Sequence, residues 1–165
     1  MILNLRELAS RSSMALSGTL DMDSLVSGQA DLRIKEPVKA ELTARYDSGT
    51  AIVVGTMKTV LGHSCSKCLK TFEERVQYPV AEAFTLQQSV AERDEDIHLV
   101  QGDTVDLTSY LNDTLLVHLP MAPVCDAACK GLCPVCGSDR NTGSCECAQD
   151  ATDPRLAGLK QFFDN

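Results

Sequence analysis

The sequence predicts an α+β fold: an antiparallel β-sheet, one helix packed on it, and a cysteine-rich module at the C-terminus. Three observations lead to this prediction. Apolar residues alternate at period two between residues 38 and 84, a helical pattern follows Asp106, and most of the eight cysteines fall after residue 120. The 165 residues suffice for one domain of ordinary size and a small addition. We expect residues 1–120 to form the sheet domain and residues 121–165 the module.

The strands are predicted by alternation. Residues 38–46 place apolar side chains on one face and polar ones on the other, which is typical of a half-buried strand. The turn Asp47-Ser48-Gly49 leads to a second apolar strand at 51–62, so a hairpin is expected. A third strand spans residues 72–84, where Pro79 indicates an edge position. Shorter strands are expected at 2–5 and 13–20.

One helix and one loop complete the predicted sheet domain. Residues 87–103 are polar and acidic, which predicts a mobile loop. Asp106 then caps a helix that Pro120 ends. The apolar positions of this helix are Leu107, Tyr110, Leu111, Leu115, His118 and Leu119. A short helix is also predicted after Asp153-Pro154, and its apolar face contains Leu156, Leu159, Phe162 and Phe163.

The charge of the chain excludes a protein that coats nucleic acid by bulk attraction. There are 15 basic and 23 acidic residues, giving a formal net charge of −8. The charges are unevenly distributed. Residues 33–70 carry seven bases and three acids, whereas residues 91–113 carry seven acids and one base. Such a bipolar surface suits a basic protein partner at least as well as RNA.

The N-terminal segment does not have the pattern of a signal peptide, because Arg6, Glu7 and Arg11 interrupt its apolar residues. No stretch of the sequence approaches the roughly 18 consecutive apolar residues of a membrane-spanning helix. We therefore expect a cytoplasmic protein without a membrane partner.

The eight cysteines have the spacing of metal ligands. Thiolates two to four residues apart can bind one ion together, and eight thiolates complete two tetrahedra. The cysteines are Cys65, Cys68, Cys125, Cys129, Cys133, Cys136, Cys145 and Cys147. The region from 124 to 149 has too few other apolar residues to offset the entropy of ordering it, so bound metal is expected to supply that free energy.

The motif CPVCG indicates which metal to expect. Pro134 fixes φ in the turn and Gly137 supplies a flexible position, as in a zinc knuckle. Zinc is therefore favoured over an iron–sulfur cluster, which also uses four cysteines. The alternatives are one metal with spare thiols, or disulfides, which a reducing cytosol disfavours. Because four thiolates leave no open coordination position, both zinc ions are expected to be structural.

Two pairings of the cysteines remain open. In the ordered pairing, Cys65, Cys68, Cys125 and Cys129 share one ion, and Cys133, Cys136, Cys145 and Cys147 share the other. An interleaved pairing would instead join the two CxxC motifs on one ion, as in a zinc ribbon. The ordered pairing is preferred, because residues 133–147 close a loop of only 15 residues and lose little chain entropy.

The remaining polar residues form no catalytic constellation. His63 is expected at the surface where a strand ends, His98 in solvent, and His118 as a hydrogen-bonded core residue. None has a Ser or Asp at motif spacing, so we expect no enzyme and no small-molecule substrate.

Four cations lie beside the cysteine motifs: Lys67, Lys70, Lys130 and Arg140. A zinc ion held by four thiolates carries a formal charge of −2, so these cations are expected to balance it. Contact with nucleic-acid phosphates is the alternative, and the two roles can coexist.

Several motifs together resemble one protein family. They are CSKCL after a hairpin, LPMAPVC, CKGLCPVCG, a following Asn141, the later CxC, and DPRLAGL. This set is similar to the bacterial YceD-like family, the large ribosomal RNA subunit accumulation proteins, over about residues 38–162. It departs from the family pattern in one turn, where Ser138-Asp139-Arg140-Asn141 replaces Asn-Leu-Asn, and this departure touches no thiol.

The resemblance implies a non-enzymatic ribosome biogenesis factor that supports accumulation of large-subunit (23S) ribosomal RNA. The implied partner is a large-subunit ribosomal RNA precursor or a basic ribosomal protein. Two functions of other classes remain open. One is a redox-regulated zinc-thiolate chaperone, or holdase, that releases zinc on oxidation. The other is a zinc-ribbon regulator that binds nucleic acid, which the negative net charge disfavours.

Overall fold

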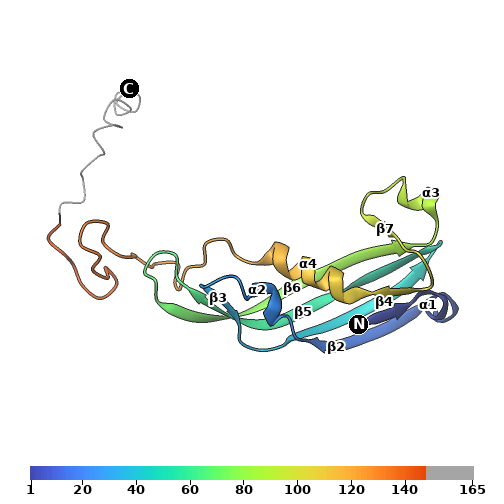
Figure 1. Ribbon diagram of the computed structural model, residues 1–165, viewed down its shortest axis with the longest axis horizontal. Coiled ribbons are helices and arrows are strands. Elements are labelled where there is room, and N and C mark those ends of the chain that lie inside the picture. Colours follow the sequence, from blue (N-terminus) through green and yellow to red (C-terminus); the bar gives the residue numbers. More distant parts are fainter. Residues whose placement is uncertain (148–165) are drawn as a thin grey trace, which may run out of the picture.

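The computed structural model describes residues 1–147 and shows an elongated α+β molecule (Figure 1). The predicted fold class is confirmed. A long twisted sheet runs along the molecule, and the cysteine-rich segment lies at one end of it. The predicted C-terminal helix, with Leu156, Leu159, Phe162 and Phe163, lies outside the described residues.

The described chain contains eight strands and four helices. In order, the elements are β1 (Ile2–Asn4), α1 (Leu5–Arg11), β2 (Ser13–Leu20), α2 (Asp23–Val26), β3 (Leu32–Ile34), β4 (Val38–Asp47), β5 (Thr50–Ser64), β6 (Thr71–Thr85), α3 (Gln88–Ala91), β7 (Ile97–Leu99), β8 (Thr104–Asp106) and α4 (Leu107–His118). All five predicted strands are present, as β1, β2, β4, β5 and β6. The two strands of the long β5–β6 hairpin have 15 residues each, more than the alternation alone predicts.

Six strands form the main sheet. Its order is β2-β4-β5-β6-β7, and β3 pairs with the far half of β5, beyond the end of β4. The β4–β5 hairpin turns through Ser48 and Gly49, whose φ angles are both positive, as a tight two-residue hairpin turn requires. The sheet is antiparallel, as predicted, except at one edge, where β7 runs parallel to β6 at residues 83–85.

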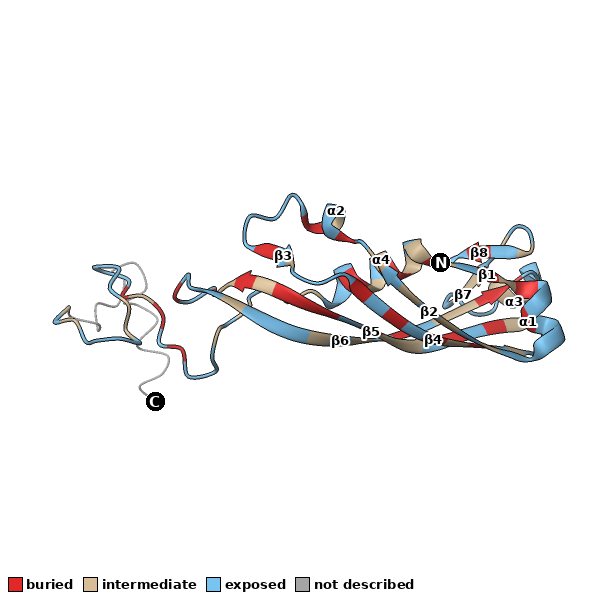
Figure 2. Ribbon diagram, turned by 90° about the horizontal axis from the view of Figure 1, so that it is seen from below, coloured by how far each residue is buried: buried red, intermediate tan, exposed pale blue. Residues whose placement is uncertain are grey.

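Helices cover one face of the main sheet and leave the other open, as Figure 2 shows. Alternate residues of β4 and β5 point to the covered face and pack against α1, α4 and the small β1–β8 sheet. The large buried side chains of this core include Leu3, Leu8, Met57, Phe84, Leu111 and Leu115. The side chains of Ile52 and Val54 point to the open face and are 41% and 42% exposed. The sheet is therefore apolar on one side and solvated on the other.

The predicted cap of α4 is confirmed. The Asp106 carboxylate accepts hydrogen bonds from the Thr108 backbone N–H at 2.9 Å and from the N-terminal ammonium at 3.1 Å. Hydrogen bonds from the side chain and backbone of Thr108 lower the pKa of Asp106 to about 2, and the ammonium group adds to the effect. The helix ends at His118, two residues before Pro120.

The acidic segment is not the plain loop that its composition predicts. It contains α3 and β7, and β7 brings His98 against the sheet. The His98 Nε2 lies 2.9 Å from a Glu82 carboxylate oxygen, and the ring packs 4.7 Å from that of Tyr110. His98 is therefore only partly solvated, because pairing with β6 draws the residue to the edge of the core and leaves 39% of its side chain exposed.

His118 is also placed differently from the prediction. It is exposed rather than part of the core. Its Nδ1 lies 2.8 Å from the Thr114 carbonyl oxygen, and its ring stacks on Tyr78 with the centroids 5.1 Å apart. The apolar face of α4 is narrower than the helical pattern predicts, because the ring lies on the flank of the helix.

Candidate metal centres

The first group of thiols joins two distant parts of the chain. Cys65 and Cys68 lie in the turn between β5 and β6, whereas Cys125 and Cys129 follow α4. Their four sulfurs lie within 4.8 Å of one another, in an arrangement that can hold a metal ion. The Cys65–Cys129 sulfur separation is 3.9 Å and the Cys68–Cys125 separation is 3.6 Å. Three of the four side chains are buried, and Phe72 and Leu132 pack around them.

The spacing of these sulfurs fits a tetrahedral ion. Four thiolates at about 2.3 Å from a central zinc ion are about 3.8 Å from one another. The two separations of 3.6 and 3.9 Å bracket this value. A disulfide would need about 2.05 Å, and all eight cysteines are free thiols. The donor set is thus a closed shell of four soft ligands, which suits zinc in a structural role.

The second group lies entirely within the C-terminal segment. It contains Cys133, Cys136, Cys145 and Cys147, whose sulfurs also lie within 4.8 Å of one another. This group is less enclosed than the first, because Cys136 is exposed and only Cys133 is buried. The two CxxC motifs therefore belong to different groups, and the grouping follows the ordered pairing rather than the interleaved one.

The two CxxC turns share one hydrogen-bond pattern. In the first, the Cys65 N–H donates to the Lys70 carbonyl and the Leu69 N–H donates to the Cys65 carbonyl, both at 2.9 Å. In the second, the Cys133 N–H donates to the Ser138 carbonyl and the Gly137 N–H to the Cys133 carbonyl, at 2.8 and 2.9 Å. The chain thus contains two CxxC turns, here called knuckles, with the same backbone hydrogen-bond pattern.

The fifth residue of each knuckle has a left-handed backbone. It is Gly137 in the second knuckle, at φ 73°, and Leu69 in the first, at φ 62°. A left-handed conformation costs a non-glycine residue roughly 1–2 kcal/mol. The Leu69 side chain gains little in return, because the residue is 67% exposed. The first knuckle therefore contains local strain that the second avoids.

Direct contacts hold the two knuckles together. The Lys70 ammonium lies 2.6 Å from an Asp139 carboxylate oxygen. The Leu132 N–H donates to the Lys67 carbonyl at 2.9 Å, and Gly131, at φ 72°, lets the two backbones approach. A Cβ at Gly131 would lie 2.9 Å from that carbonyl oxygen. The C-terminal segment that carries the second group of thiols, here called the second module, is thus attached to the β5–β6 hairpin by a backbone hydrogen bond and by an ion pair.

Asn141 connects the second module to the first group of thiols. Its side-chain N–H₂ donates to the Cys129 sulfur at 3.5 Å and to Asp139 at 2.8 Å. Its side-chain oxygen accepts from the Lys130 backbone N–H at 2.7 Å. A hydrogen bond to a ligand sulfur is the kind of outer contact that orients metal ligands. Sequence analysis did not identify Asp139 or Asn141 as part of the site, although an Asp two residues before an Asn is a turn-forming pattern.

The thiol pKa values in the first group diverge. A backbone hydrogen bond with Cys125 lowers the pKa of Cys65 to about 6. A side-chain hydrogen bond with Cys68, together with burial, raises the pKa of Cys125 to about 12. Four thiolates in contact repel one another, so a proton remains on the group until a cation replaces it.

The second group repeats this division. Hydrogen bonding with the Ser138 side chain, whose oxygen lies 3.0 Å from the Cys136 sulfur, lowers the pKa of Cys136 to about 6. A side-chain hydrogen bond with Cys136 raises the pKa of Cys147 to about 12. In both groups, a bound metal ion would displace the remaining proton.

The other predicted site residues are distributed around the knuckles. Lys67 and Lys130 are exposed, Lys70 is paired with Asp139, and Arg140 is half-buried. His63 is 3% exposed, so the expectation of a surface histidine is wrong. It is buried because it continues the inward-facing residues of β5, and its Nε2 lies 4.0 Å from a Glu74 oxygen. Burial lowers the pKa of His63.

Among the described residues, no helix is long and apolar enough to cross a membrane.

Comparison with known proteins gives consistent results. Residues 53–163 match the family described as large ribosomal RNA subunit accumulation protein YceD. The uncharacterized protein YlbN of Bacillus subtilis is 26% identical over 154 residues, which are 93% of this chain and 90% of YlbN. An uncharacterized protein of Mycobacterium tuberculosis is 33% identical over 111 residues, which are 64% of this chain and 54% of that protein.

A shorter match reaches a relative with a descriptive name. The chloroplastic large ribosomal RNA subunit accumulation protein YCED homolog 1 of Arabidopsis thaliana is 31% identical over 49 residues, which are 30% of this chain and 15% of the homolog. No solved structure gives a significant match. The family match covers well over half of the sequence and includes all eight cysteines of the two groups. The chain therefore belongs to the YceD family of large ribosomal RNA subunit accumulation proteins.

Proposed function

We propose that this protein is a non-enzymatic ribosome biogenesis factor that supports the accumulation of large-subunit (23S) ribosomal RNA. The observation that carries the proposal is the family match over residues 53–163. The two thiol groups agree with it, because four ligands close each candidate site and leave no position for a substrate. The proposal places the protein in the cytoplasm, where ribosomes assemble and thiols stay reduced.

We assign a structural zinc ion to each group of four cysteines. Few side chains are buried between Met121 and Cys147, so apolar burial contributes little to the order of this segment. Structural zinc contributes roughly 10–16 kcal/mol of apparent folding free energy in small finger peptides. Zinc in the first group would fasten the segment to the β5–β6 hairpin, and zinc in the second would shape the module itself.

Two partner types fit the charges of the molecule. Precursor ribosomal RNA would meet the cations beside the knuckles, among which Lys67 and Lys130 are exposed. Lys70 is paired with Asp139, so its first role in this proposal is to attach the module and balance the thiolate charge. A basic ribosomal protein would instead meet the exposed acids of the segment from Glu92 to Asp96. Neither partner requires a small-molecule substrate or a membrane.

Deletion of the gene from its bacterium tests the proposed function. We expect less 23S ribosomal RNA and a lower ratio of large to small subunits in sucrose gradients. The wild-type gene should restore both, whereas Cys65→Ser/Cys129→Ser should not. Unchanged subunit ratios and 23S levels would contradict the proposal. Peroxide treatment separates it from a holdase, because zinc release that switches on suppression of protein aggregation would favour the chaperone function.

A further inference from the structure

The positively charged segment of the sequence becomes one surface of the fold. Lys58 on β5 points to the open face of the sheet. Residues that lie directly opposite each other in paired strands share a face, so the register of β3, β4, β5 and β6 shows which other side chains point the same way as Lys58. This set includes every base of these strands together with Lys35, which follows β3. The bases are Arg33, Lys35, Lys39, Arg45, Lys58 and Arg75, and all six are exposed. Three acids of these strands, Glu41, Asp47 and Glu73, share the face with these six bases, so the face carries a net positive charge within a chain of net charge −8.

Two of these bases form a like-charge pair that lowers the stability of the fold. Lys39 on β4 is directly opposite Lys58 on β5. Like charges in a directly opposed cross-strand pair are destabilising. Glu41 lies 2.9 Å from Lys58 and compensates that lysine alone. Lys39, Arg45 and Arg75 have no ion pair within residues 1–147. These three exposed cations are therefore available to an anionic partner.

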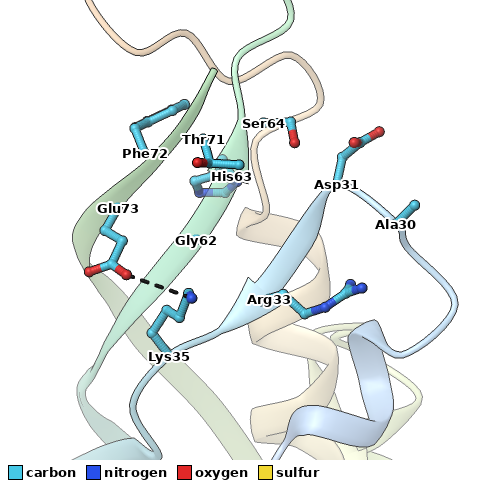
Figure 3. Close-up of a pocket in the computed structure, with 10 residues that line it drawn as sticks. All are labelled: Ala30, Asp31, Arg33, Lys35, Gly62, His63, Ser64, Thr71, Phe72 and Glu73. Carbon is cyan, nitrogen blue, oxygen red and sulfur yellow. Dashed lines mark ion pairs between the residues drawn. The ribbon is translucent and has the colours of Figure 1, made fainter. Parts of the chain in front are cut away.

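The surface is hollowed beside these cations. Lys39, Lys58 and Arg75 line one hollow of about 390 Å³ together with the acid Glu36. Arg33 and Lys35 line a second hollow of about 310 Å³, shown in Figure 3, together with the acids Asp31 and Glu73.

Figure 3 also shows an ion pair beside the second hollow. Lys35 lies across Gly62 and reaches toward Glu73, with the charged atoms 3.7 Å apart. A Cβ at Gly62 would lie 2.7 Å from the Lys35 side chain, so glycine at this position leaves room for that side chain.

We propose that the open face of the sheet, around Lys39, Lys58 and Arg75, binds the phosphate backbone of RNA. This inference rests on the proposed function and adds a docking surface to it. RNA suits the face better than a basic protein does, because the face is itself positive. Contact with phosphates positions RNA without reading its sequence. The aromatic residues of the paired strands, including Tyr46, Tyr78 and Phe84, face the core, so these rings are not available for base stacking.

Fluorescence anisotropy with two labelled RNAs tests the proposal. The probes are a mixed-sequence single strand of about 20 nucleotides and its duplex, each titrated with the zinc-loaded full chain between 50 and 300 mM salt. The test variant is Lys39→Gln/Arg75→Gln. Arg6→Gln/Arg11→Gln removes the same charge from α1 and serves as the matched control, and Lys67→Gln/Lys130→Gln tests the knuckles as the competing surface. Thermal melting and zinc content check that each variant is folded.

The wild type should bind with an affinity that falls steeply with salt and depends little on sequence. Each lost phosphate contact reduces the slope of log affinity against log salt by about 0.7 for a single strand, so the test variant should lose about 1.4 and bind on the order of 25-fold more weakly at 0.1 M salt. The α1 control should bind RNA as the wild type does, and Lys39→Arg/Arg75→Lys should retain most of the affinity.

Three results would overturn the proposal. One is a test variant that binds RNA like the wild type. The second is a loss of binding confined to Lys67→Gln/Lys130→Gln. The third is a wild type that binds neither RNA but binds a polyglutamate peptide through Lys39 and Arg75, which would identify an acidic protein as the occupant. Each result leaves the proposed function standing if gene deletion still lowers 23S levels, so the two failures are distinguishable.

Discussion

Lys70 and Asp139 join the two cysteine modules across 69 residues of sequence. The ammonium Nζ of Lys70 lies 2.6 Å from Oδ2 of Asp139, and hydrogen bonding with Lys70 is the main reason that the pKa of Asp139 is lowered. The same carboxyl group accepts from the Asn141 backbone and side chain. One aspartate therefore attaches the second module to the hairpin and positions the amide that contacts Cys129.

This relationship predicts a coupled effect. Asp139→Asn should speed zinc loss to a chelator from the first group, because it removes the ion pair and weakens the support of Asn141. Lys70→Gln should do so to a smaller extent. In the double variant, the fold-increase in the rate of zinc loss should be smaller than the product of the two single-variant increases, because both single changes break the same contact. If the two single-variant fold-changes in release rate simply multiply in the double variant, the pair does not act as a unit.

Asn141→Ala should weaken zinc binding at the first group without changing any ligand. Removing an outer-shell hydrogen bond to a metal ligand typically costs 10–100-fold in affinity, so a loss of roughly tenfold is expected. Competition with a fluorescent chelator measures it. Asn112→Ala, on helix α4, is the control and should bind zinc as the wild type does. Equal affinities for wild type and Asn141→Ala would mean that the amide only supports the turn.

The two knuckles should respond in opposite ways to substitution at their fifth residue. Leu69→Gly relieves a left-handed leucine, and the gain is partly offset by the greater entropy of glycine in the unfolded chain, so a net stabilisation of about 0.5–1 kcal/mol is expected. Gly137→Ala should destabilise by about 1 kcal/mol. A Cβ at Gly137 meets no atom within 4 Å, so the effect is one of backbone alone. Thermal melting of the zinc-loaded protein measures both changes in stability. If the two substitutions shift the melting temperature in the same direction, the left-handed backbone of Leu69 is not strained.

Metal affinity should rise with pH. The pKa values of Cys125 and Cys147 are about 12, so both thiols are protonated in the metal-free protein at neutral pH. Zinc must displace these protons, and higher pH makes their release easier. Lowering the pH from 8 to 6 should therefore weaken binding at both groups, and the thiols of Cys65 and Cys136, with pKa values of about 6, add to the effect at the acid end. Calorimetry in buffers of different ionisation enthalpy counts the released protons. A pH-independent affinity would exclude this mechanism.

The parts of the fold that sequence predicts best are those that a local pattern encodes. Val38, Ala40, Leu42 and Ala44 alternate because every second side chain of β4 enters the core, so the strand can be read from the chain alone. The cap is equally local, since the Asp106 carboxylate accepts from the backbone N–H of Thr108, only two residues along the chain. The three-residue strands β3 and β7 are too short for any alternation, and their partners on β5 and β6 lie elsewhere in the sequence.

In the candidate site, too, sequence identifies the residues that a local pattern encodes and misses those that depend on distant parts of the chain. Cysteine spacing identifies the eight thiols, because ligands of one ion must lie close along the chain or in pairs. Asp139 cannot be identified from sequence, since its role depends on Lys70, which is distant along the chain. Sequence places His63 at the surface because the apolar run ends at residue 62, whereas β5 continues to Ser64 and keeps this histidine inside. The net charge of residues 33–70 is visible in the sequence, but only strand register shows that its bases share one face.

The metal content of the purified protein tests the central claim most directly. Native mass spectrometry and elemental analysis of the full chain, purified under reducing conditions, should find two zinc ions per chain and eight reduced thiols after chelation. A folded protein without bound metal, or one in which the sulfurs of Cys65 and Cys129 are joined as a disulfide in the cell, would contradict the account.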